Sequence, residues 1–207
     1  MPQRSARFAV TTAALALAVL AGLAGAASAD MTVTGDQAAW QEVQAAFAKL
    51  NTLPGYRMKS TMAGGGTIVI EVTSGGNMMH MLMHTPSGNM ESYTVNGQTR
   101  MKNDMPGALP GWHCIGPQAP MAGQPDPTKA QGTVDIARGQ DATIDGQPAH
   151  TYVYTVQSGG QSSKQTLYVG AANGLPRRVV IAAPGGDQTM DYYDYGAAIQ
   201  FTAPACM

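Results

Sequence analysis

The chain has 207 residues, with 12 Lys and Arg against 13 Asp and Glu and a formal net charge of −1. It contains no cluster or run of basic residues, so a nucleic acid partner is not expected. Charged residues make up only 12% of the chain, and the length of residues 30–207 suits a single domain with a sizeable core.

The N-terminal segment has the order of a secretory signal peptide. Two arginines precede an apolar run over residues 8–23, which ends in the small residues Ala27-Ser28-Ala29. The run is shorter than the roughly 20 residues that a membrane-spanning helix needs, and no cysteine lies near the cut to carry a lipid. We therefore predict that residues 1–29 are cleaved and that the remaining domain is a soluble protein of the periplasm.

The next predicted element is an amphipathic helix. Thr34, with Gln37 three residues on, matches a capping box. The apolar residues that follow share one helical face, and they are Trp40, Val43, Phe47 and Leu50. Asn51 and Pro54 mark the end of the helix. Because a helix of this length is marginal alone in water, its apolar face must be buried against a larger element.

The rest of the chain has the pattern of strands joined by short turns. A first run of strands is predicted at residues 55–62, 67–74, 77–85, 89–95 and 99–102, and a second run begins near Val134 and continues at 149–156, 164–170, 175–183, 189–196 and 198–204. The dipeptides Asn96-Gly97, Asp145-Gly146 and Asn173-Gly174 are turn signals. Residues 103–131 contain six prolines and are predicted to form a long crossing loop.

These elements predict a mainly β (α+β) fold. One helix and many strands indicate a curved antiparallel sheet, open or nearly closed into a half-open β-barrel, with the N-terminal helix packed on or in its concave face. No internal repeat or further domain boundary is visible.

The chain has two cysteines, Cys114 and Cys206. In an oxidising compartment such a pair is predicted to form a disulfide, which would pin the C-terminal tail to the middle of the fold. A redox or metal-binding thiol pair is the alternative, but the C-x-x-C spacing typical of such pairs is missing.

No pattern for catalysis is visible. The sequence lacks the G-x-S-x-G elbow that carries the nucleophilic serine of many hydrolases. Its four histidines match no zinc signature. We therefore expect no enzyme activity and no cofactor.

Methionine is the unusual component of the composition, with 14 in the chain. Several occupy the predicted strand at 77–85, where alternation places Met79, Met81 and Met83 on one face and His80 and His84 on the other. Three interpretations remain open. The Met row lines an adaptable apolar cavity; or His80 and His84, with nearby thioethers, bind Cu(I); or the methionines fill an ordinary core.

Several sequence motifs follow one another along the chain in an order that can be compared with known families. They are V-N-G-Q (95–98), A-T-I-D-G-Q-P-A-H-T-Y-V-Y-T-V (142–156), L-Y-V-G-A-A-N-G-L-P-R-R-V-V-I (167–181) and M-D-Y-Y-D-Y-G-A-A-I-Q-F-T-A-P (190–204). With the preceding helix, this order resembles the LolA-like superfamily of lipoprotein-sorting and related exported lipid-binding proteins. The resemblance implies an eleven-stranded half-open barrel, with helices as a lid over an apolar cavity that carries acyl chains.

The resemblance has one departure. Lipoprotein carriers have an R-P-x-x-F-x-W pattern on the third strand, and residues 76–83 here have neither its arginine nor its aromatic residues. The family therefore implies a general role in binding a lipid or another hydrophobic ligand, with lipoproteins and envelope proteins as the partner classes. The predicted cavity residues are Trp40, Phe47, Tyr56, Met58, Ile70, Met79, Met81 and Met83. A structural or interaction protein with a filled core is the remaining alternative.

Overall fold

The computed structural model describes most of the chain beyond the predicted signal peptide, which lies outside the described residues. The described ranges are residues 31–62, 65–73, 78–115, 132–158, 161–183 and 186–206.

Helix α2 (Gln37–Asn51) begins two residues later than the sequence predicts, with its N-cap at Asp36 instead of Thr34. Its N-cap is Asp36, whose Oδ1 accepts hydrogen bonds from the backbone N–H groups of Ala38 and Ala39, each at 3.0 Å. The predicted capping box at Thr34 is wrong, because this residue belongs to strand β1 (Met31–Gly35). Residues 31–35 pair in parallel with a strand about 100 residues later, and that distant partner leaves no local signal.

In the part of the chain that the structure describes, thirteen strands form one sheet. After β1 they are β2 (Gly55–Thr61), β3 (Thr67–Thr73), β4 (Met78–Thr85), β5 (Gly88–Val95), β6 (Gln98–Asn103), β7 (His113–Ile115), β8 (Gly132–Arg138), β9 (Ala142–Ile144), β10 (Gln147–Ser158), β11 (Gln161–Gly170), β12 (Pro176–Ile181) and β13 (Gln188–Tyr193). The predicted strands of both runs are confirmed up to residue 193. The predicted strand at 198–204 is wrong, since this stretch is not a strand, and β7 lies where only a loop was expected.

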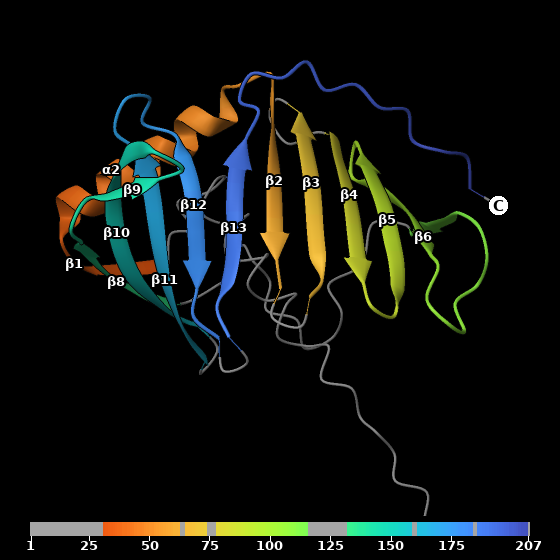
Figure 1. Ribbon diagram of the computed structural model, residues 1–207, viewed down its shortest axis with the longest axis horizontal. Coiled ribbons are helices and arrows are strands. Elements are labelled where there is room, and N and C mark those ends of the chain that lie inside the picture. The colour runs from red at the N-terminus through yellow and green to blue at the C-terminus, as the bar shows by residue number, and fades with distance from the viewer. Residues whose placement is uncertain are drawn as a thin grey trace, which may run out of the picture.

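The sheet consists of two meanders joined in the middle. Its order is β1-β8-β10-β11-β12-β13-β2-β3-β4-β5-β6-β7, with β9 paired to β10 at the side. The junction is the antiparallel pairing of β13 with β2, so the C-terminal meander lies beside the first strand of the N-terminal one. The sheet is curved but open (Figure 1), because β1 and β7 stand at opposite ends of the order. The predicted half-open fold is confirmed, although β1 and β8 pair in parallel.

Two of the three predicted dipeptide turns have two positive φ angles; at Asn173-Gly174 only Gly174, with a φ of 62°, has one. Asn96 and Gly97 have φ angles of 50° and 77°, and Asp145 and Gly146 have 50° and 74°. Two successive positive φ angles are the geometry of the tight turn whose twist matches that of a hairpin. These turns fix the register of β5 with β6 and of β9 with β10.

The helix covers only one half of the sheet. It lies across the face of the C-terminal meander (Figure 1), where it contacts β1, β8 and β12. Val43, Phe47 and Leu50 of the helix share a buried cluster with side chains such as Val134, Leu167 and others of β8 to β13. We call this side of the sheet the inner face. No helix within the described residues is long and apolar enough to cross a membrane.

Candidate ligand-binding face

The inner face continues from the helix-covered core onto the N-terminal meander. Residues directly opposite each other on neighbouring strands point to the same side of a sheet. The Tyr192 ring of β13 packs edge-on against the Phe47 ring of the helix, with 6.5 Å between the ring centroids. Across the junction, Tyr192 is opposite Met58 of β2. Met58 is opposite Ile70, and Ile70 is opposite Met81. One side-chain row therefore runs from the core out to β4 without changing face.

The same register defines an apolar surface over β2 to β6, which we call the methionine face. It consists of Met58, Ile68, Ile70, Val72, Met79, Met81, Met83, Met90 and Met101. The three β3 residues form a second buried cluster, and no residue of α2 belongs to it within the described part of the chain. Ile70 is only 1% exposed, whereas Met79, Met81 and Met83 are half-buried. The methionines therefore form the partly accessible layer of this face.

Methionine is not the usual choice for such a strand. Strands favour β-branched and aromatic residues, and β3 follows this rule with Ile68, Ile70 and Val72 on the same face. On β4 the three corresponding inner positions are all methionine. An unbranched thioether side chain is flexible and polarisable and adapts to irregular partners. The change from branched residues to methionine thus coincides with the change from a buried to a partly accessible surface.

The predicted cavity residues fall into two groups. Trp40 and Phe47 belong to the helix-covered cluster, while Ile70, Met79, Met81 and Met83 belong to the cluster on the methionine face. Tyr56 and Met58 pack against both clusters and connect them. That these eight residues line one cavity stays a prediction. Sequence reasoning missed Met90, Met101 and the buried Ser92 between them, although strand alternation from the Asn96-Gly97 turn places all three on one face.

The opposite side of the sheet, the outer face, carries a row of polar and charged side chains. In register order the row is Tyr193, Arg57, Glu71, His80, Tyr93, Arg100 and Cys114. Arg57 Nε lies 2.7 Å from Glu71 Oε1, and Glu71 Oε2 lies 3.0 Å from His80 Nδ1. His80 Nε2 lies 2.9 Å from Glu91 Oε1, which also accepts a hydrogen bond from the Tyr93 hydroxyl at 2.9 Å. This network links β2, β3, β4 and β5.

Ionisation of the network follows from its contacts. Partial burial opposes the charge on Glu71, but hydrogen bonds from His80 and Arg57 outweigh this and lower the pKa of Glu71. Burial, with the hydrogen bond to the Glu91 carboxylate, raises the pKa of Tyr93 to about 12. The carboxylate of Glu71 is therefore held in its charged form, and the Tyr93 hydroxyl is held as a donor.

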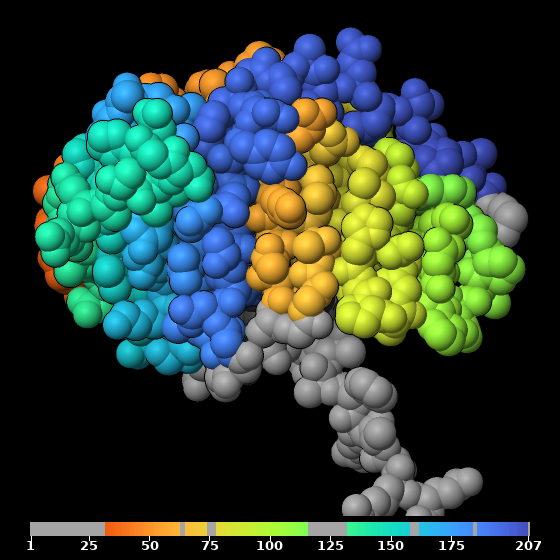
Figure 2. Space-filling view, in the orientation of Figure 1, coloured from red at the N-terminus to blue at the C-terminus, as the bar shows by residue number. Residues whose placement is uncertain are grey.

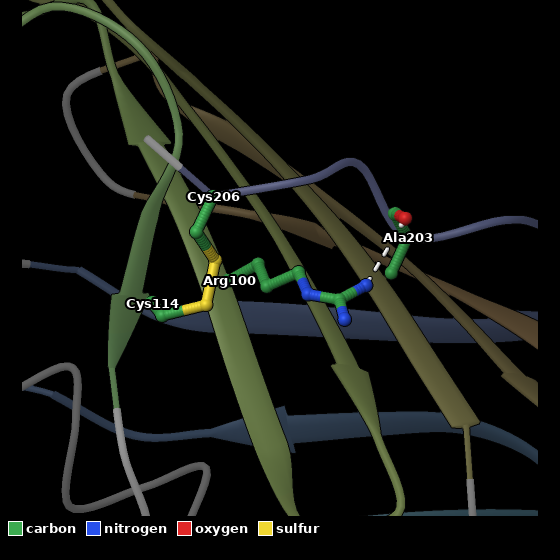
Figure 3. Close-up of a disulfide and its surroundings, with 4 residues drawn as sticks. All are labelled: Arg100, Cys114, Ala203 and Cys206. Carbon is green, nitrogen blue, oxygen red and sulfur yellow. Dashed lines mark hydrogen bonds between the residues drawn. A yellow bond between two sulfur atoms is a disulfide. The ribbon is translucent and has the colours of Figure 1, made fainter.

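The C-terminal tail lies along this outer row. The centroid of the Phe201 ring lies 5.8 Å from that of the His80 ring and 5.5 Å from that of the Tyr93 ring. The His80 and Tyr93 rings stack on each other with their centroids 4.2 Å apart. Arg100 Nη1 donates to the carbonyl oxygen of Ala203 at 3.0 Å, and Cys206 is bonded to Cys114 of β7 (Figure 3). Seen from the outer side, the tail passes near one end of β2 to β6 (Figure 2). The predicted disulfide is present, and it fastens the tail to the edge strand.

The two histidines considered as copper ligands lie away from the Met row. Both ring nitrogens of His80 contact carboxylates, and His84 Nδ1 lies 2.9 Å from the side-chain oxygen of Asn89. Both are on the outer face, while Met79, Met81 and Met83 are on the inner face. Within the described residues, no group of three or more His, Cys, Asp or Glu side chains could hold a metal ion.

An open depression of about 550 Å³ lies beside the junction of the two meanders. Its lining includes Lys59, Asp145, Arg178, Asp191 and Tyr195. Arg178 pairs with Asp191 and, at 3.7 Å, with Asp145. Because opposite charges line it, this depression does not suit an apolar ligand.

Comparison with known proteins identifies the fold. No protein-family model and no curated protein matches the sequence. Among solved structures, the lipoprotein LppX of Mycobacterium tuberculosis superposes with a TM-score of 0.60 at 10% identity, over 80% of this chain and 99% of that one. LprF of Mycobacterium bovis gives a TM-score of 0.55 at 16% identity, over 83% and 99% of the two chains.

A LolA superfamily protein from Nitrosomonas europaea also matches, at 10% identity over 76% of this chain and 92% of that one, with a TM-score of 0.30. The superpositions on LppX and LprF, and not this weaker match, show that the chain has a half-open, LolA-like fold. Over the described ranges the sheet has thirteen strands, two more than the resemblance in sequence implies.

Proposed function

We propose that this protein binds a hydrophobic ligand of the lipid class on the methionine face. The observation that supports the proposal is the unequal cover of one continuous apolar face. The helix packs against the C-terminal meander, while the methionines of the N-terminal meander stay half-buried. Partly accessible apolar surface that adjoins a core favours association with an apolar partner.

The composition of the face suits an acyl chain or a similar apolar group. Its side chains are aliphatic or thioether, with Tyr56 at its border to the core. Burial raises the pKa of the Tyr56 hydroxyl, which keeps that group neutral beside an apolar ligand. The LolA-like fold and the likeness to a mycobacterial lipoprotein support a lipid or lipoprotein acyl chain as the ligand class.

We place this activity outside the cytoplasm, in the periplasm. The disulfide between Cys114 and Cys206 is of a kind that forms and persists in oxidising compartments. The predicted signal peptide over residues 1–29 supports the same location. In this proposal the protein carries its ligand within the cell envelope, and envelope proteins are a second class of partner.

Uptake of a fluorescent fatty acid by the delipidated protein tests the proposal. We expect binding to the wild-type chain and a loss of roughly tenfold or more in Met81→Lys, because a charge placed in the apolar contact costs well over 1.4 kcal/mol. Leu82→Lys is the matched control. It is the next residue on β4, is also half-buried, and faces the outer side, so its uptake should match the wild type.

Native mass spectrometry of gently purified protein gives the complementary measurement and should show a co-purifying lipid. A protein that carries no lipid and takes up no fatty acid contradicts the proposal. Equal uptake by the Met81→Lys and Leu82→Lys variants would move the ligand away from the methionine face.

A further inference from the structure

Three methionines at the far end of the methionine face stand close together on two strands. Met83 of β4 is directly opposite Met90 of β5, and Met81 is two residues before Met83 on the same face. The position opposite Met81 is Ser92, a small side chain that is 5% exposed. On the other side of Ser92 stands Met101 of β6. Four thioethers therefore surround one small residue.

The spacing of a β-sheet brings three of these thioethers within reach of one point. Neighbouring strands lie about 4.8 Å apart, and same-face residues on one strand are separated by about 6.6 Å. A point midway between Met81 and Met90 then lies about 4 Å from the Cβ atoms of Met81, Met83 and Met90. A methionine side chain has three rotatable bonds and can turn its sulfur toward such a point. The missing bulk at Ser92 leaves room for the sulfurs to converge.

We propose that Met81, Met83 and Met90 form a thioether site for a soft monovalent cation, Cu(I), with Met101 next to it. Thioethers are soft ligands that select Cu(I) over harder cations. The ligands are neutral and the surroundings apolar, so the site stabilises a single positive charge far better than a divalent one. All four methionines are half-buried, which leaves a route for the ion.

This site differs from a His80 and His84 copper site. Those histidines are on the outer face, where His80 Nδ1 and Nε2 are held by Glu71 and Glu91. The cation site therefore uses sulfur alone. It also does not depend on the proposed lipid ligand, since replacing methionine by leucine removes the sulfur but keeps the face apolar.

Titration with Cu(I) against a competing chelator tests the site. We expect one Cu(I) to bind per chain. The Met83→Leu and Met90→Leu variants should each bind Cu(I) roughly 10–100-fold more weakly, because even the loss of a residue that only supports a metal ligand lowers the affinity by this much. Leucine conserves the volume, so both variants should fold, which circular dichroism checks. Met78→Leu, on the same strand but opposite Val95 rather than Met90, should bind as the wild type does.

X-ray absorption of the copper-loaded protein should show sulfur neighbours and no nitrogen neighbour, and His80→Ala should keep the wild-type affinity. The proposal is overturned if the wild type fails to compete for Cu(I), if the two leucine variants bind normally, or if nitrogen ligands appear. Fatty acid uptake by the wild type is measured in parallel. Uptake without competition for Cu(I) overturns this site alone, whereas Cu(I) binding without uptake overturns the lipid proposal alone.

Discussion

The two halves of the inner face use the same sheet in different ways. On the C-terminal meander, strands β8 to β13 bury residues such as Val134, Leu167 and Val179 completely beneath helix α2. On the N-terminal meander, β3 is buried but the methionines of β4 remain half-exposed. The first half is stabilised by its own packing. The second half keeps partly accessible apolar surface, where we propose that the ligand binds. Its outer side is held by the tail and the disulfide.

The largest expected effect is on the helix-covered half. Phe47 is 3% exposed and packs against Tyr192, so Phe47→Ala should lower the free energy of unfolding by about 3–5 kcal/mol. Met83→Ala, on the methionine face, removes a half-buried side chain and should cost clearly less, roughly 1–2 kcal/mol. Urea unfolding measures both. Equal losses would mean that the methionine face is as tightly packed as the core.

Removal of the disulfide should affect the other half. The Cys114→Ser, Cys206→Ser double variant opens a loop with a sequence separation of 92 residues and should lose about 2–4 kcal/mol. Hydrogen exchange should locate the change, with faster exchange in β6 and β7 and little change in the native-state exchange of β10 and β11. Uniform acceleration over the whole sheet would show that the two halves open as one unit.

The smallest expected effect concerns the outer row. Because the folded protein lowers the pKa of Glu71, this carboxylate stabilises the fold above its ordinary pKa of about 4.3 and loses that contribution as the pH falls through the lowered value. The wild type should therefore lose stability as the pH falls from about 5 through the lowered pKa of Glu71. Over the same fall in pH, the Glu71→Gln variant should lose roughly 1 kcal/mol less of its free energy of unfolding, about the contribution of one hydrogen bond.

Urea midpoints at several pH values measure this difference. Asp104→Asn is the control, because Asp104 is an exposed carboxylate beside Lys102 in the same half, and its loss with acid should follow the wild type. A Glu71→Gln variant with the full acid dependence would contradict the role given to the Arg57, Glu71 and His80 contacts.

The sequence predicts local features of this fold well. The Asn96-Gly97 and Asp145-Gly146 turns each carry their own conformational signal, and alternation along residues 78–85 separates the Met row from His80 correctly. The two cysteines could pair only with each other, so the disulfide needs no knowledge of the fold. The half-open LolA-like architecture follows from the strand pattern together with the quoted motifs.

Features that depend on distant pairing could not be predicted. Thr34 resembles a helix cap, yet it is held in β1 by residues around Val134. Residues 198–204 have a strand-like pattern, but β13 already has β12 and β2 on its two sides, so no strand edge is free where the tail begins. The tail instead crosses the outer row through Phe201 and Arg100. The grouping of Met83 with Met90 likewise depends on the register of a hairpin.

The disulfide also sets an order of events in maturation. The covalent loop from residue 114 to residue 206 contains every strand from β8 to β13, so Cys114 must wait for its partner until that whole meander has been synthesised. The tail begins where β13 lies beside β2, and it spans the outer side of the first meander from there. Closure of the β7 edge therefore follows synthesis of the whole C-terminal meander, and a chain in which it has closed has met an oxidant.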